Sequence, residues 1–191
     1  GEANSDPECA ITSPVAAGLV AAGASNLFEG TASDVEDEAS ELTFELLMAG
    51  SRVGSGSVEA DGTWSSEVIG LNLGSRTIDL VVLDSVGGEC STSVQVTVSN
   101  APAVSIQFPT NNGTVNEGAG ESFLGTAIDQ EDSEPALEVV WTSDIDGTLG
   151  TGNPTTIGEV VLDDVVLSAG THVITLEATD SDGLTGRAAV N

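Results

Sequence analysis

Acidic side chains gather in two segments of the C-terminal half of this 191-residue chain. The segments are GTAIDQEDSEPAL (residues 125–137) and TDSDG (residues 179–183), and neither contains Lys or Arg. Five of their carboxylates are candidate metal ligands: Asp129, Glu131, Asp132, Asp180 and Asp182. Ca²⁺ binds about 6–8 oxygen ligands, many of them carboxylates, whereas Zn²⁺ prefers Cys and His. If the segments meet, they form a candidate calcium site; otherwise these are ordinary solvated turn residues.

The same sequence pattern occurs twice in the chain. GTASDVEDEASEL at residues 30–42 matches GTAIDQEDSEPAL, 95 positions later. LGSRTIDLVVLDSVG at residues 73–87 matches AGTHVITLEATDSDG at residues 169–183, a shift of 96. A period of this length is too long for a solenoid repeat and is that of a small domain. The chain therefore contains two copies of one module.

The first copy retains most of the acidic positions. They are Asp34, Glu36, Asp37 and Asp84. Val86 stands where the second copy has Asp182, so we expect a weaker calcium site there.

The composition bounds the partners of the chain. There are 31 Asp and Glu against 3 Lys and Arg, which gives a net charge of −28. Binding to nucleic acid or to an anionic membrane surface needs Lys and Arg, so both partners are excluded. No apolar run approaches the ~20 residues of a membrane span, so no membrane insertion is expected. The 39% of hydrophobic residues suffices for two cores.

Alternating apolar residues and turn signals predict an all-β fold. In the first copy strands are expected near residues 8–13, 26–33, 42–48, 63–71, 76–84 and 91–99. In the second copy they are expected near residues 104–108, 121–128, 137–142 and 172–180, and from residue 186. About seven short strands per ~95 residues indicate two tandem immunoglobulin-like β-sandwiches. Trp64 and Trp141 are expected to fill the two cores.

GTAIDQEDSEPALEVVWTSDIDGTLG, followed by LSAGTHVITLEATDSDGLTG, resembles the Ig-like and PKD-like repeats of bacterial surface proteins. It is similar, more distantly, to cadherin-type repeats. The resemblance covers nearly the whole chain and implies an extracellular β-sandwich. The cadherin likeness implies that an ion at the acidic end of the second copy would lock the angle between the domains.

The Ig-type topology brings the acidic segments together. The loop between the second and third strands and the loop between the last two strands emerge at one end of such a sandwich. Cys9 precedes the first strand and Cys90 opens the last strand at this same end. We therefore expect a disulfide, which closes a loop of about 80 residues and implies an oxidising, exported setting.

Other residues carry weaker signals. His172 is the single histidine and is expected to be structural, although a Ser-His-Asp triad would have to use it. Asp163 and Asp164 are neighbours on a strand and would face opposite ways. Asn112 begins an Asn-Gly-Thr glycosylation sequon in a turn.

The expected domain boundaries are a tether at residues 1–7, a first domain at 8–99, a linker at 100–103 and a second domain at 104–191. The last strand of the second copy stops before the counterparts of Val96 and Val98. We expect either a fragment of a longer chain or a partner strand that completes the sheet edge.

These features favour a non-enzymatic extracellular structural protein of a bacterial surface, a stalk or filament segment that bound calcium would stiffen. Its partners would be copies of itself or neighbouring surface-protein domains. An adhesive or carbohydrate-binding module and a spacer of a larger secreted enzyme are the alternatives. The absence of Tyr and the few Trp and Phe disfavour sugar binding.

Overall fold

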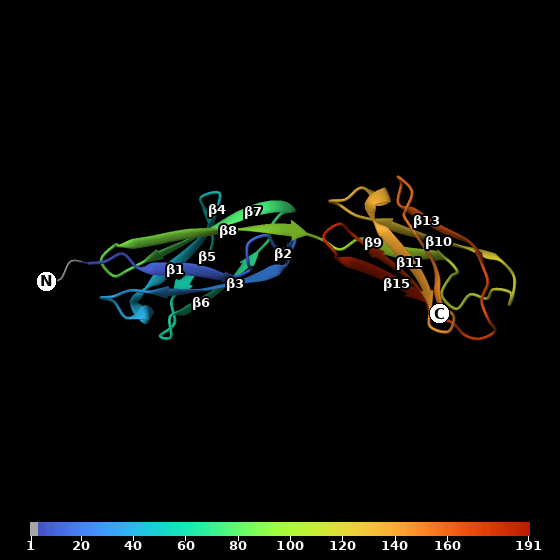
Figure 1. Ribbon diagram of the computed structural model, residues 1–191, viewed down its shortest axis with the longest axis horizontal. Coiled ribbons are helices and arrows are strands. Elements are labelled where there is room, and N and C mark those ends of the chain that lie inside the picture. The colour runs from blue at the N-terminus through green and yellow to red at the C-terminus, as the bar shows by residue number, and fades with distance from the viewer. Residues whose placement is uncertain (1–3) are drawn as a thin grey trace. The chain divides into compact units, whose positions relative to one another are not determined.

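The computed structural model describes residues 4–191. The chain divides into two compact units, Gly1–Ser99 and Asn100–Asn191. Each unit is an all-β sandwich with a single short 3₁₀ turn among its described residues (Figure 1).

The first domain has two sheets. Its strands are β1 (Glu8–Ser13), β2 (Gly18–Ala21), β3 (Ser25–Ser33), β4 (Thr43–Met48), β5 (Ser51–Ser57), β6 (Thr63–Ile69), β7 (Gly74–Leu83) and β8 (Glu89–Ser99). One sheet has the order β1-β3-β6 and the other β2-β8-β7-β4-β5. β2 runs parallel to the end of β8, and the other neighbouring strands are antiparallel. This is the immunoglobulin-like arrangement that the sequence predicts.

The second domain repeats the arrangement without a counterpart of β2. Its strands are β9 (Ala103–Phe108), β10 (Glu121–Ile128), β11 (Glu138–Ser143), β12 (Gly147–Gly152), β13 (Glu159–Val165), β14 (Ile174–Thr179) and β15 (Thr185–Val190). The sheets have the orders β13-β10-β9 and β12-β11-β14-β15. β14 begins at Ile174, two residues later than the expected 172–180 strand. Residues 172 and 173 have no partner in β15, because its pairing with β14 begins at Ile174 and Val190.

Each core is built around one tryptophan. Trp64 lies on β6 and Trp141 on β11, and both are buried. Both indoles pack over glycines at matching positions of the repeat, Gly30 on β3 and Gly125 on β10. A Cβ at Gly30 would lie 2.3 Å from the Trp64 ring, so the glycine makes room for it. The two domains thus fill one core position with tryptophans from different strands.

Residues 4–7, which the sequence analysis assigned to a tether, hydrogen-bond to the first domain, and Pro7 is buried. Residues 1–3 of that expected tether lie outside the described residues. No helix in the described part of the chain is long and apolar enough to span a membrane.

Candidate functional site

The acidic loops begin with an aspartate that folds its own loop. The Oδ1 atom of Asp129 accepts the backbone N–H groups of Glu131 and Asp132, each at 2.8 Å. Asp34 does the same for Glu36 and Asp37 in the first domain, at 2.8 and 2.9 Å. An aspartate that accepts main-chain N–H groups two and three residues later stabilises a turn. The local sequence therefore stabilises the shape of each loop.

A second aspartate joins the two acidic loops. The carboxylate of Asp132 accepts the backbone N–H and the hydroxyl of Ser181, at 2.7 and 2.9 Å. Asp37 accepts the same two groups of Ser85, at 2.7 and 3.0 Å. Both pairs connect loops about 48 or 49 residues apart in sequence. The sandwich topology thus brings the loops together as predicted, and hydrogen bonds between them take up one carboxylate in each domain.

A glutamate in each loop holds the residues that lead into the domain. We call these residues, 5–7 and 100–102, the lead-in segments. Glu131 accepts the backbone N–H of Asn100 at 2.6 Å. Glu36 accepts the backbone N–H and the hydroxyl of Ser5, both at 3.2 Å. Ser5 and Asn100 are 95 positions apart, so both copies of the module hold the incoming chain at the same point.

The aspartate of the other loop differs between the domains. In the first, Asp84 Oδ1 accepts the N–H groups of Val86, Gly87 and Gly88, and Asn4 Nδ2 donates to Oδ2 at 2.7 Å. The Asn4 bond, joined by the backbone donors, lowers the pKa of Asp84 from 3.8, against the opposing effect of burial. In the second domain, Asp180 Oδ1 accepts the N–H of Leu184.

Some buried carboxylate oxygens have no hydrogen-bond donor in the described structure. They are Oδ2 of Asp34, Asp129 and Asp180. The residues Asp129 and Asp180 are about nine-tenths buried, with 9% and 8% of their surface exposed. These two oxygens are the features of the second domain that most resemble free cation ligands.

The five predicted calcium ligands do not form one metal-binding group. Within residues 4–191, no three or more His, Cys, Asp or Glu side chains are arranged to hold a metal ion together. The reason is that Asp132 binds Ser181 and Glu131 binds the lead-in segment, while Asp182 is exposed. In the first domain Glu36 and Asp37 are occupied in the same way.

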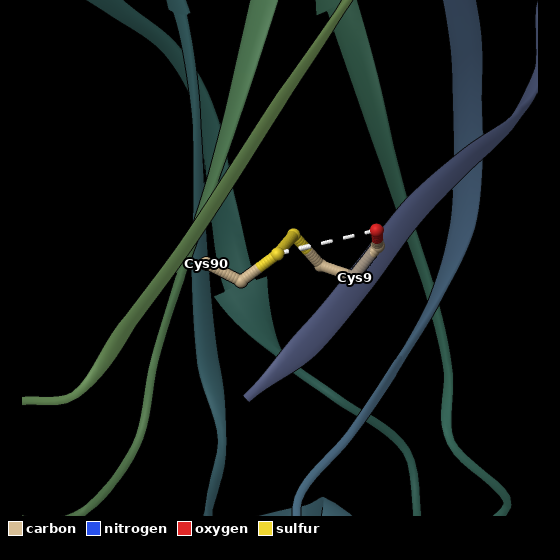
Figure 2. Close-up of a disulfide and its surroundings, with 2 residues drawn as sticks. All are labelled: Cys9 and Cys90. Carbon is tan, nitrogen blue, oxygen red and sulfur yellow. Dashed lines mark hydrogen bonds between the residues drawn. A yellow bond between two sulfur atoms is a disulfide. The ribbon is translucent and has the colours of Figure 1, made fainter. Parts of the chain in front are cut away.

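Cys9 on β1 and Cys90 on β8 form a disulfide, as the sequence predicts, with their Cα atoms 6.0 Å apart (Figure 2). It joins the two sheets of the first domain. The counterparts in the second domain are Val104 and Gly186. A Cβ at Gly186 would lie 1.8 Å from the carbonyl oxygen of Pro102 and 3.1 Å from a Val104 methyl group. The backbone of the lead-in segment thus approaches the strand where the first domain has a cysteine.

His172 belongs to a buried polar cluster. Its Nδ1 lies 2.8 Å from the Ser143 hydroxyl and 3.6 Å from an Asp146 oxygen, and its Nε2 lies 2.9 Å from the Ser168 carbonyl. A carbonyl only accepts, so Nε2 carries a proton, and in the neutral ring Ser143 donates to Nδ1. In a catalytic triad the serine and the aspartate use opposite ring nitrogens. Here Ser143 and Asp146 lie at the same nitrogen, Nδ1, so the cluster does not have the geometry of such a triad.

Ser168 gives its N–H and hydroxyl to Asp146, and these bonds, with a smaller effect of the His172 charge, lower the pKa of Asp146 from 3.8. Asp163 and Asp164 are both exposed near the end of β13, and Asp163 accepts the Ser122 hydroxyl at 2.6 Å. Asn112 of the sequon is exposed, with φ of 58°.

Sequence reasoning missed the role of the lead-in segments. A signal was present, because Pro7 and Pro102 are 95 positions apart and both are buried. The repeat therefore begins before the first strand.

No family model and no curated protein matches the sequence. Among solved structures, an I-band fragment of titin matches with a TM-score of 0.54 and 16% identity, covering 98% of this chain and 65% of that chain. The fibronectin(III)-like modules of Clostridium thermocellum CbhA match with a TM-score of 0.45 and 20% identity, covering 96% and 92%. At 16% identity, the likeness to the titin fragment shows the immunoglobulin-like fold alone.

Proposed function

We propose that this protein is a non-enzymatic, exported structural protein that serves as a stalk or filament segment of a bacterial surface assembly. Its two domains act as stiff spacers, and its partners are copies of itself or neighbouring surface domains. The disulfide supports an oxidising compartment outside the cytoplasm, where such bonds persist. The resemblance of the sequence to the Ig-like and PKD-like repeats of bacterial surface proteins supports the bacterial surface.

One observation carries the proposal: each domain holds its lead-in segment with a glutamate at the same position of the repeat. The contacts Glu36–Ser5 and Glu131–Asn100 attach the chain immediately before each sandwich. Pro102, which is buried, further restricts the backbone between Ser99 and β9. A short, held linker limits independent motion of the domains, and limited motion is what a spacer requires.

Small-angle X-ray scattering of the purified chain tests this proposal. A stiff spacer predicts a distance distribution that one conformation fits. Substitution of Glu131 by Ala should broaden the distribution, because the Asn100 N–H loses its acceptor. The matched control is Glu121→Ala, which removes a glutamate of the same domain that makes no hydrogen bond through its side chain among the described contacts. A broad distribution already present in the unsubstituted chain would refute the spacer role.

We also propose that the second domain binds calcium, with fewer carboxylates than the sequence predicts. The ligands would be the two buried oxygens without hydrogen-bond donors, Oδ2 of Asp129 and Oδ2 of Asp180. Thermal unfolding in EDTA and in millimolar Ca²⁺ tests this. Binding at 100 times Kd adds about 2.7 kcal/mol to stability. The increase should vanish in the Asp129→Asn, Asp180→Asn double variant. No increase beyond that in NaCl of equal ionic strength would exclude calcium, and light scattering in the same scans would detect self-assembly.

A further inference from the structure

The three-stranded sheet β13-β10-β9 of the second domain (Figure 1) carries a row of apolar side chains on its outer face. Leu124 on β10 pairs with Val161 on β13 and with Phe108 on β9. Leu124 stands between Phe123 and Gly125, which are both buried, so its side chain points away from the core. Phe108 and Val161 are 38% and 49% exposed. We call Phe108, Leu124 and Val161 the apolar row.

The equivalent row of the first domain is polar. There Glu29 on β3 pairs with Ser13 on β1 and with Ser65 on β6. Glu29 and Leu124 are 95 positions apart, as are Ser13 and Phe108, so the two rows occupy the same place in the repeat. In both domains the pairing of the first strand skips one residue immediately before the row. The fold therefore places three side chains here in each copy and does not need them to be apolar.

Phe108 is the exposed aromatic residue of the chain. The chain has six Trp and Phe and no Tyr, and the structure describes all six. The other five are at most 2% exposed. The Phe108 ring lies edge-on to the buried Phe123 ring, with their centroids 6.5 Å apart. Aromatic side chains are enriched at the cores of protein–protein interfaces, so the exposed ring indicates a binding face.

Carboxylates flank the apolar row. Glu159, Val161 and Asp163 occupy alternate positions of β13, so all three side chains lie on the outer face. Within residues 4–191 neither Glu159 nor Asp163 forms a salt bridge. The outer face is therefore apolar along the row and negatively charged on both sides of Val161.

This combination of charge and apolar surface determines the kind of partner. A second copy of the chain is a poor match, because its net charge is −28 and it has no lysine. Its three arginines already bond within their own domains: Arg52 with Glu45, Arg187 with Glu177, and Arg76 with backbone carbonyls. A polypeptide that carries Lys or Arg beside apolar side chains complements both parts of the face.

We propose that the apolar row binds a basic segment of another protein, in which Lys or Arg flank apolar side chains. The apolar side chains would cover the row, and the cationic side chains would lie against Glu159 and Asp163. Burial of the row would supply most of the affinity, and the charges would select the partner. The inference goes beyond the spacer role and concerns the second domain by itself, so either can fail without the other.

The test uses the full chain and the peptide KKVFVKK in about 0.15 M salt, which screens charges more than about 8 Å apart. NMR measures the affinity and identifies the residues whose signals shift. We expect saturable binding with shifts at the apolar row. Of two control peptides, EEVFVEE reverses the charges and KKSSSKK removes the apolar side chains. Each should bind at least about tenfold more weakly than KKVFVKK.

Exchanging the row between the domains tests the residues themselves. The variant Phe108→Ser, Leu124→Glu, Val161→Ser gives the second domain the row of the first. It should bind KKVFVKK at least about tenfold more weakly, because the apolar surface is gone. Attraction by charge alone predicts the opposite, since the added glutamate makes the chain more negative.

A second variant leaves the apolar row intact. Glu159→Gln with Asp163→Asn removes the two flanking charges and should weaken binding by about threefold or more. Glu117→Gln with Glu138→Gln is the matched control, because it removes two exposed carboxylates of the same domain that lie outside this sheet. The control should bind as the unsubstituted chain does.

The proposal is overturned if KKSSSKK binds as tightly as KKVFVKK, or if the signals that shift belong to the acidic loops and not to the apolar row. It is also overturned if the exchanged row or the neutralised carboxylates leave the affinity unchanged. Sedimentation of the chain without peptide is the remaining measurement. Self-association that the row exchange abolishes would overturn the proposal in favour of a second copy as the occupant.

Discussion

The two domains secure the corner between their first and last strands in different ways. In the first domain the Cys9–Cys90 disulfide crosses this corner. In the second domain Val104 and Gly186 occupy the same positions, and the Pro102 carbonyl lies against Gly186 so closely that a Cβ would not fit. A covalent bond in one copy thus corresponds to close backbone packing in the other.

The aspartate–serine hydrogen bonds between the acidic loops, by contrast, are the same in both copies. Asp37 and Asp132 join the loops through Ser85 and Ser181. We call these two pairs of hydrogen bonds the loop clamp. The comparison indicates that the loop clamp belongs to the repeated module, whereas the disulfide is particular to the first domain. Substitutions at the disulfide and at Gly186 should therefore each affect one domain, whereas substitutions at Asp37 and Asp132 should have equal effects.

The largest effect is expected from removing the disulfide. Replacing Cys9 and Cys90 by Ser should lower the free energy of unfolding of the first domain by about 2–4 kcal/mol, because the unfolded chain regains the entropy of a long loop. The second domain should be unaffected. Hydrogen exchange measured residue by residue separates the domains, and an equal loss in both would contradict the division.

Next in size is the substitution Gly186→Ala. The new methyl group would overlap the Pro102 carbonyl oxygen, so the lead-in backbone must move, at a cost of about 1–3 kcal/mol. Chemical denaturation monitored by NMR should show the loss in the second domain alone. Gly152→Ala is the control, since a Cβ there meets no atom within 4 Å. Equal stability of the Gly186 and Gly152 variants would show that the close packing does not matter.

A smaller and symmetrical effect is expected in the loops. Asp37→Ala and Asp132→Ala each remove two hydrogen bonds to a serine and should destabilise their own domain by about 1 kcal/mol. Asp182→Ala is the matched control, since this exposed side chain makes no hydrogen bond among the described contacts. A clear difference between the two aspartate variants would argue against a shared clamp.

The smallest effect concerns acid. The lowered pKa of Asp84 means that folding favours the deprotonated carboxylate. The contribution of Asp84 to the free energy of unfolding is therefore complete above the pKa of the unfolded chain, about 3.9, and is lost as the pH falls through the lower pKa of the folded chain. Asn4→Ala should raise this pKa towards its ordinary value. NMR titration of the Asp84 carboxyl carbon measures it directly, and an unchanged titration in the variant would show that Asn4 is not the cause.

The fold followed from the sequence because its signals are local and repeated. Period-two alternation, as in Ile78, Leu80 and Val82, marks a strand with one buried face, and these side chains are fully buried. The partner of Cys9 could also be predicted, since Cys90 is the one other cysteine.

The site was harder to predict, because carboxylates hydrogen-bond with donors that no acidic pattern reveals. Ser181 and the backbone of Asn100 are such donors. Glu131 therefore looked like a metal ligand in the sequence, while in the structure it holds the lead-in segment. Asp129 holds its own loop through Oδ1 and leaves only Oδ2 without a donor. The burial of a carboxylate oxygen, as in Asp180, is a tertiary property and needs coordinates.

Amide hydrogen exchange at Ser5 and Asn100, followed by NMR in the unsubstituted chain and in the Glu36→Ala, Glu131→Ala variant, tests the central claim most directly. If Glu36 and Glu131 each hold the lead-in segment of their own domain, both amides should exchange at least about tenfold more slowly than in an unfolded chain. Both amides should lose this protection in the variant. Exchange at unfolded-chain rates in the unsubstituted protein would contradict the claim.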